Sequence, residues 1–164
     1  MTATPLRTNL RCMIDASLTF RPALPTDAPA IRALVLAAYA KWVPVMGREP
    51  MPMTADYDMA VQKHQFRLAY QGDDLVGLIE TDTQADHIWI ENIAVRSDCQ
   101  GRGIGQSLLR SVDADARELG LPEVRLLTNA ALVSNIRMYQ AFGFTLDRTE
   151  AFRGGFVVLM SKPV

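Results

Sequence analysis

The sequence predicts a mixed α+β domain built around one largely antiparallel sheet, and three observations favour this class. Of the 164 residues, 49% are hydrophobic, which is enough for one domain with a substantial core. Apolar residues alternate in some segments and recur with helical spacing in others. Three strand-like segments follow one another directly between helical segments, which argues against a doubly wound parallel sheet.

The first part of the chain is expected to form one strand and two helices. The strand covers residues 18–21 and ends at Pro22. Thr26 or Asp27 can cap the helix that follows, whose apolar residues recur at helical spacing. Residues 42–55 are expected to be an irregular loop, because several prolines and glycines interrupt them, and a second short helix is expected after Asp56.

The remaining elements are indicated by their periodicity and by turn residues between them. Gly72, Asp73 and Asp74 form a hairpin signal between two of the strands. The expected order is strands over 66–70, 75–81 and 87–95, a helix over 104–119, a strand over 124–128, a helix over 134–142 and two strands over 144–149 and 156–162.

Composition and charge exclude several classes of function. The net charge of −1 gives no basic footprint for nucleic acid. No clustered His/Cys pattern indicates a metal site. The most apolar stretch, 31–42, falls short of the ~20 residues that a bilayer requires. Residues 1–16 are expected to be an N-terminal extension and 17–164 a single domain, located in the cytoplasm; a homodimer is compatible with the sequence.

The most informative segment is Gln100-Gly101-Arg102-Gly103-Ile104-Gly105, which lies between a buried strand and an amphipathic helix. Glycines let a backbone approach a ligand closely, and the free N–H groups of a helix start attract anions such as phosphate. Arg102 adds positive charge. The segment lacks the Gly-Lys-Ser/Thr of a nucleoside-triphosphatase loop, and its spacing does not fit the dinucleotide pattern.

The spacing Q-x-x-G-x-G after Ile93-Ala94-Val95 resembles the pyrophosphate loop of the GNAT superfamily of N-acetyltransferases. The segment from Asn135 to Phe144 is similar to that family's "N-x-x-x-Y-x-x-x-G-F" helix, and the matching motifs span 87–146. The resemblance implies a central mixed, largely antiparallel sheet that is splayed between its fourth and fifth strands and flanked by about four helices.

The resemblance also implies that acetyl-coenzyme A is the cosubstrate. Its pantetheine arm would bind the backbone of Ile93, Ala94 and Val95. Its pyrophosphate would bind the glycine loop, Gln100 to Gly105. The residues implied in cofactor binding are Ile93, Ala94, Val95, Gln100, Gly101, Arg102, Gly103, Ile104, Gly105, Asn129, Asn135 and Tyr139.

Two side chains are candidates for acid–base chemistry. Glu91 lies in an apolar strand, where a carboxylate is costly unless it is paired or functional. Strict alternation would place it, buried, on one face with Trp89, Ile93 and Val95. The resemblance implies that this face looks toward the acceptor site, where Glu91 would be a base or amine binder; an ion pair or a backbone-anchoring role is the structural alternative. Tyr139 matches the family position that often protonates the leaving thiolate, or else it is a packing aromatic. His87 is a weaker candidate for a proton relay.

Aromatic and Met residues gather in the irregular segment 39–57, and long loops often carry function. In the family this connection borders the acceptor pocket; a small satellite core is the alternative. The expected acceptor-binding residues are Tyr39, Trp42, Met46, Arg48, Met51 and Tyr57.

The resemblance therefore implies an N-acetyltransferase that moves an acetyl group from acetyl-coenzyme A to a primary amine of a small molecule, by direct attack through a tetrahedral intermediate and without a metal. Two alternatives remain open. One is a non-catalytic acyl-coenzyme A sensor, and the other is an acetyltransferase acting on protein lysines or N-terminal amines.

Overall fold

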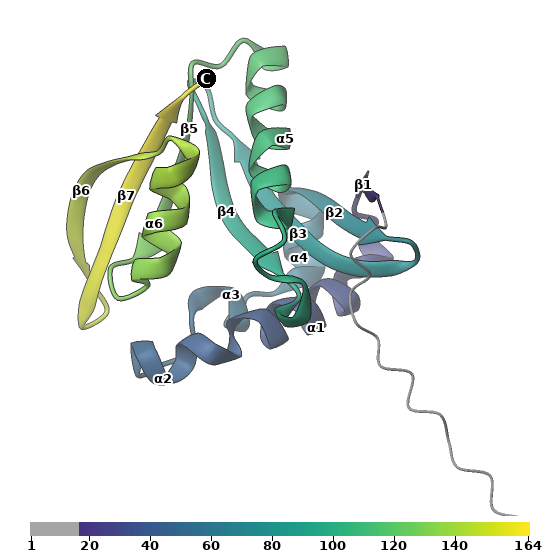
Figure 1. Ribbon diagram of the computed structural model, residues 1–164, viewed down its shortest axis with the longest axis horizontal. Coiled ribbons are helices and arrows are strands. Elements are labelled where there is room, and N and C mark those ends of the chain that lie inside the picture. The colour runs from purple at the N-terminus through teal and green to yellow at the C-terminus, as the bar shows by residue number, and fades with distance from the viewer. Residues whose placement is uncertain (1–16) are drawn as a thin grey trace, which may run out of the picture.

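The computed structural model describes residues 17–164, so the expected extension over 1–16 lies outside the described residues. It contains seven strands and six α-helices within that range, with short 3₁₀ turns between some of them (Figure 1). The elements are β1 Leu18–Pro22, α1 Ala28–Tyr39, α2 Val43–Met46, α3 Met51–Thr54, α4 Tyr57–Lys63, β2 Gln65–Gln71, β3 Asp74–Thr83, β4 Ile88–Val95, α5 Ile104–Leu119, β5 Glu123–Asn129, α6 Val133–Phe142, β6 Thr145–Phe152 and β7 Gly155–Pro163.

All seven strands form one sheet in the order β1-β2-β3-β4-β5-β7-β6. Every neighbouring pair is antiparallel except β4 and β5, which run parallel because α5 crosses over between them. The mixed, largely antiparallel sheet predicted from the sequence is confirmed.

The sheet is split between β4 and β5. Their backbone pairing covers only Ile88–Ile90 against Val124–Leu126, at the end where both strands begin. Figure 1 shows the two strands diverging from there, with α2 and α3 lying toward the open end. Beyond Ile90, β4 has no strand partner on this side within the described chain, so its backbone borders the split.

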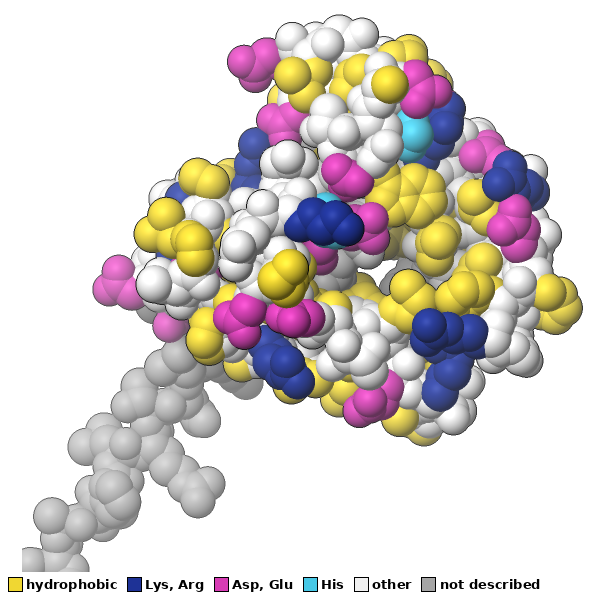
Figure 2. Space-filling model, turned by 180° about the vertical axis from the view of Figure 1, so that it is seen from behind, with side chains coloured by type: hydrophobic (Ala, Val, Ile, Leu, Met, Phe, Trp, Pro, Cys, Tyr) yellow, Lys and Arg dark blue, Asp and Glu magenta, His cyan; other side chains and the backbone are white. Residues whose placement is uncertain are grey.

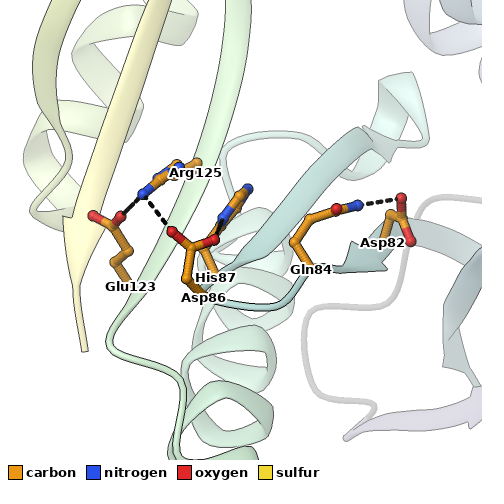
Figure 3. Close-up of polar contacts among 6 residues, drawn as sticks. All are labelled: Asp82, Gln84, Asp86, His87, Glu123 and Arg125. Atoms are coloured by element: carbon orange, nitrogen blue, oxygen red, sulfur yellow. Dashed lines mark hydrogen bonds and ion pairs between the residues drawn. The ribbon is translucent and has the colours of Figure 1, made fainter.

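At the closed end of the split, polar contacts link β5 to the turn before β4 (Figure 3). Arg125 in β5 donates a hydrogen bond to Glu123, and its Nη2 lies 3.3 Å from Asp86 Oδ2 in the turn before β4. His87 Nδ1 lies 2.7 Å from Asp86 Oδ1. His87 thus belongs to the closed end and lies outside both cavities described below, so the structure does not support it in a proton relay.

β4 contains a β-bulge at Glu91. Glu80 pairs with Asn92 and Thr81 pairs with Ile90, which leaves Glu91 without an opposite residue on β3. An extra residue reverses the side-chain alternation beyond it. Ile88 and Ile90 accordingly share one core with Ile93 and Val95, so the expected common face of Trp89, Glu91, Ile93 and Val95 is wrong.

The core has two parts, one on each face of the sheet. α5 and the aromatic residues of α6 cover one face, where Leu108, Leu109 and Val112 are among the fully buried side chains. α1 and α4 cover the other face, with Ile31 and Val35 fully buried. Each helix therefore packs one apolar stripe on the sheet.

The segment expected as an irregular loop is partly helical. The helical run continues to Met46, since Pro44 lies in the first turn of α2, where a missing N–H is tolerated. Gly47 ends it at φ 68°, and α3 follows. The helical run Pro25–Met46 has 22 residues and contains an 18-residue window with a mean hydropathy of 1.2, so it is long and apolar enough for a membrane span. Its buried residues here pack on the sheet.

Candidate active site

Two cavities open into the split, one on each side of β4. The first has a volume of about 280 Å³ and lies between α2–α4 and the β5–β7 half of the sheet. The second, about 620 Å³, lies between the loop before α5 and α6. Figure 2 shows the opening from behind, bordered largely by hydrophobic side chains, with acidic, basic and His side chains gathered along one side.

The second cavity is built on the start of α5. Gly103 caps this 16-residue helix in the left-handed conformation, at φ 80°, and Gly101 has φ 74°. A Cβ built on either glycine would meet no atom of the described chain within 4 Å, so the space in front of the loop is open. Glycine leaves the first N–H groups of the helix without a side-chain cap, and these groups with the helix dipole form an anion site.

Side chains from the first half of the chain complete the mouth of this cavity. Gln100 donates its Nε2–H to the carbonyl oxygen of Val95 at 3.0 Å, which ties the loop to the end of β4. Lys41 Nζ donates to Gln100 Oε1 and lies 4.7 Å from the centre of the Trp42 ring. A positive charge that the sequence analysis did not assign to the cofactor site therefore lies beside the glycine loop.

Most of the residues expected to bind the cofactor border this second cavity. Arg102 does not line it and lies near Asp98, whose pKa it helps to lower after the larger effect of Arg96. Asn129 borders the first cavity instead, and its Oδ1 accepts a hydrogen bond from Ala131 N. The expected residues that do line the second cavity are Ile93, Ala94, Val95, Gln100, Gly101, Gly103, Ile104, Gly105, Asn135 and Tyr139.

The first cavity contains most of the expected acceptor-binding residues. Trp42 is the exception, because its position after α1 places it in the second cavity. Arg48 lies 6.0 Å from the centre of the Phe152 ring, which comes from the β6–β7 hairpin and which the sequence did not single out. The expected residues found here are Tyr39, Met46, Arg48, Met51 and Tyr57.

Glu91 lines the first cavity but is exposed, so the expectation that it is buried is wrong. The bulge accounts for this position, since an unpaired residue of a strand can project away from both cores. A carboxylate that faces an open cavity remains available to a ligand.

Tyr139 is buried on α6, with 6% of its surface exposed. Its ring makes an edge contact with Phe144 at 5.8 Å between centroids. Burial raises the pKa of the Tyr139 phenol well above its usual value, so the hydroxyl keeps its proton and can donate it.

A buried carboxyl does lie in this cavity, at a position that sequence reasoning missed. Glu80 in β3 is only 6% exposed, and its Oε1 lies 2.7 Å from Nδ1 of His64, the residue after α4. Burial raises the pKa of the Glu80 carboxyl, and the hydrogen bond from His64 opposes that rise. The signal in the sequence was a lone acid in the apolar run Leu75–Thr81.

A hydrogen-bond network fixes the bulge of β4 to the helices. The Tyr39 hydroxyl lies 2.6 Å from Asn92 Oδ1 and 3.2 Å from the carbonyl oxygen of Ile93. Asn92 Nδ2 donates to the Tyr57 hydroxyl, which itself donates to the carbonyl oxygen of Pro52. Burial raises the pKa of both tyrosines, so they remain neutral hydrogen-bonding groups.

The two cavities meet inside the split. Four residues border both of them: Tyr39, Ile93, Asn135 and Tyr139. A ligand held at the start of α5 and a second ligand under α2–α4 would therefore come together beside the free edge of β4.

Comparison with known proteins bears directly on this arrangement. The model of the acetyltransferase (GNAT) family matches residues 31–144. An uncharacterized N-acetyltransferase, YvbK of Bacillus subtilis (strain 168), is 27% identical over 94 residues, which cover 57% of this chain and 61% of that protein.

Two solved structures share the fold. The PaiA N-acetyltransferase of Thermoplasma acidophilum, in complex with coenzyme A, has a TM-score of 0.76 at 16% identity, covering 90% of this chain and 99% of that one. A GNAT family acetyltransferase of Elizabethkingia anophelis with acetyl-CoA bound has a TM-score of 0.65 at 19% identity, covering 92% and 99%.

Proposed function

Because the chain belongs to the acetyltransferase (GNAT) family, we propose that it transfers the acetyl group of acetyl-coenzyme A to the primary amine of a small molecule in the cytoplasm. The observation that carries this proposal is the meeting of two cavities at Tyr39, Ile93, Asn135 and Tyr139. One cavity has the features of a phosphate site, and the other carries acidic side chains suited to a cation.

The residues present fit acetyl-coenzyme A. The uncapped start of α5 and the open space before Gly101 and Gly103 suit its pyrophosphate, and the nearby Lys41 adds a positive charge. The edge of β4 from Ile93 to Val95 pairs with no strand on this side of the described chain, and its carbonyl oxygens at the two ends accept side-chain hydrogen bonds. Its remaining main-chain groups can hydrogen-bond to an extended, amide-containing arm, as a sheet edge does with a peptide. When bound, the cosubstrate would supply an acetyl group activated as a thioester.

Residues of the chain would then bind the ammonium ion of the acceptor and transfer the protons of the reaction. Glu91, which lines the acceptor cavity, would attract the ammonium group of the acceptor and accept a proton from its nitrogen. The buried phenol of Tyr139, which borders both cavities, would protonate the departing thiolate.

The proposal is tested by incubating the protein with acetyl-coenzyme A and a panel of alkylamines, polyamines, amino acids and peptides, with product mass as the readout. A gain of one acetyl group on small amines supports the proposal. Acetylation of peptides alone would favour a protein-modifying enzyme, and coenzyme A binding without any product would favour a sensor.

We expect Tyr139→Phe to lower kcat at least tenfold while leaving the affinity for acetyl-coenzyme A nearly unchanged. The hydroxyl is needed only as the thiolate departs, and an interaction confined to the transition state appears in kcat. Steady-state kinetics and calorimetry measure the two effects. Tyr70→Phe is the matched control, since Tyr70 lies on β2 and bonds to Arg21 outside both cavities. Equal rates for the two variants would leave Tyr139 a packing residue.

We expect Arg48→Ala to raise the KM of a carboxylate-bearing acceptor about tenfold, because a lost charged hydrogen bond costs about 1.5–3 kcal/mol, and to leave the KM of an uncharged analogue unchanged. Arg48 lines the acceptor cavity. Arg153 also lies over Phe152 but does not line the cavity, so Arg153→Ala is the control. The same KM increase for both acceptors would contradict a charge-specific role.

A further inference from the structure

His64 and Glu80 form a hydrogen-bonded pair in the wall of the acceptor cavity. Glu80 is almost fully buried, whereas the His64 side chain retains 18% exposure. With Nδ1 engaged by Glu80, the second ring nitrogen of His64 is left for another contact. A carboxylate that holds one nitrogen of an imidazole sets its orientation and tautomer.

Acidic groups surround this imidazole from several elements. Glu80 from β3 and Glu91 from β4 line the same cavity, as do the neutral phenols of Tyr57 and Tyr39. Asp82 from β3 lies beside the cavity lining, and its Oδ2 accepts a hydrogen bond from Gln84. One ring nitrogen of His64 and one oxygen each of Asp82 and Glu91 lie within 4.8 Å of one another. Among the described residues that line this cavity, the only Lys or Arg is Arg48, beside Phe152 on the other half of the sheet.

The proton balance of the reaction calls for two protein groups that can accept protons from the amine nitrogen. An amine enters as an ammonium ion, and its nitrogen must lose one proton before it attacks and a second once it has bonded to the acetyl carbon. The new C–N bond replaces the C–S bond; one proton is returned to the thiol sulfur and one leaves to solvent. Glu91 accounts for the removal of one proton from the nitrogen.

We infer that His64 is a second catalytic base, which takes the first proton from the acceptor's ammonium group, and that Glu80 positions it. This inference rests on the proposed function. Nδ1–H donates to the Glu80 carboxylate, and the free Nε2 accepts the proton while Asp82 and Glu91 hold the cation. An imidazole suits this step because one ring nitrogen can accept a proton while the other keeps its hydrogen bond to the carboxylate.

The tautomer can be measured without any turnover. Nitrogen-15 NMR of the imidazole rings, recorded at pH 7–8 with coenzyme A, should show His64 as the neutral Nδ1–H form. The chain has two histidines, so His64→Gln identifies the signal and His87 is the internal control. Glu80→Gln should change the His64 signal and leave that of His87 unchanged. A His64 that stays doubly protonated throughout this range, or that carries its proton on Nε2, would overturn the inference.

Kinetics separate proton removal from packing. With the best amine of the panel, His64→Gln should lower kcat/KM about tenfold or more at pH 7, and the loss should shrink as the pH approaches the pKa of that amine, because the acceptor then arrives already neutral. Glu80→Gln should show the same trend with a smaller loss, and His87→Gln should match the wild type.

The remaining outcomes all count against the inference. If kcat/KM falls by the same factor at every pH in folded His64→Gln and Glu80→Gln variants, the pair is a structural contact and His64 is not a base. Activity that disappears with a chelator and returns with zinc or magnesium ions would make the cluster a metal site. If the wild type acetylates no amine, the proposed function fails, whereas the NMR result still decides the state of the pair.

Discussion

Glu91→Gln is expected to lower kcat about a hundredfold or more, within the range of about 10²–10⁴ that a positioned acid–base group contributes. Glutamine keeps the size of the side chain but cannot accept a proton from the acceptor nitrogen. Glu91 is exposed in the acceptor cavity at a bulge, so the exchange should disturb neither core. The folded structure and the affinity for acetyl-coenzyme A should remain close to those of the wild type.

Steady-state rates over the pH range of stability are the measurement, and the shape of the loss identifies its cause. If Glu91 takes the second proton, the deficit persists at high pH, in contrast to the deficit expected for His64→Gln. If Glu91 mainly binds the ammonium ion, KM rises and kcat changes little. Glu118→Gln, an exposed change on α5, is the control. Wild-type kcat and KM in a folded Glu91→Gln variant would remove Glu91 from the mechanism.

Gly103→Asp should weaken the binding of acetyl-coenzyme A at least a hundredfold, about 2.7 kcal/mol or more. Two effects act together. The φ of 80° disfavours any side chain with a Cβ, and the carboxylate would lie where the start of α5 is expected to hold pyrophosphate.

A matched control separates these two effects. Gly120 ends the same helix with φ 68° and has equally open surroundings, so Gly120→Asp introduces similar strain and the same charge far from the loop. Calorimetry should show near-normal affinity for Gly120→Asp and strongly reduced affinity for Gly103→Asp. Equal affinities would place the cosubstrate elsewhere on the protein.

The order of the elements was predictable from the sequence because short-range signals, such as periodicity and turn residues, mark each element. Helical periodicity and the two flanking glycines indicated α5 at its observed bounds, Ile104–Leu119. The run of apolar residues over 87–95 indicated a central strand, and β4 is found there. The structure of the segment 42–55 was harder to predict. Pro44 is compatible both with the first turn of a new helix and with the end of the preceding one, and the local sequence does not distinguish these cases. Tertiary packing decides between them.

The positions of the acidic side chains in the acceptor cavity were less predictable, because they depend on the register in which neighbouring strands pair. The bulge at Glu91 exists only in the pairing of β3 with β4, and no residue of the β4 sequence marks it. His64 and Glu80 are 16 residues apart and meet because β2 and β3 are adjacent strands. Single-strand alternation therefore predicted a buried Glu91, whereas the buried acid is Glu80.

The short pairing of β4 with β5 also bears on how the protein stays apart from its neighbours. A free strand edge on a surface is a template to which a strand of another molecule can add, and such edges promote aggregation. Here the free edge from Ile93 to Val95 faces into the split, whose other wall is formed by β5 and α6. An extended ligand in the second cavity would meet these backbone groups between the two walls. The split therefore keeps an unpaired strand edge off the outer rim of the sheet, where strand addition by another molecule would promote aggregation.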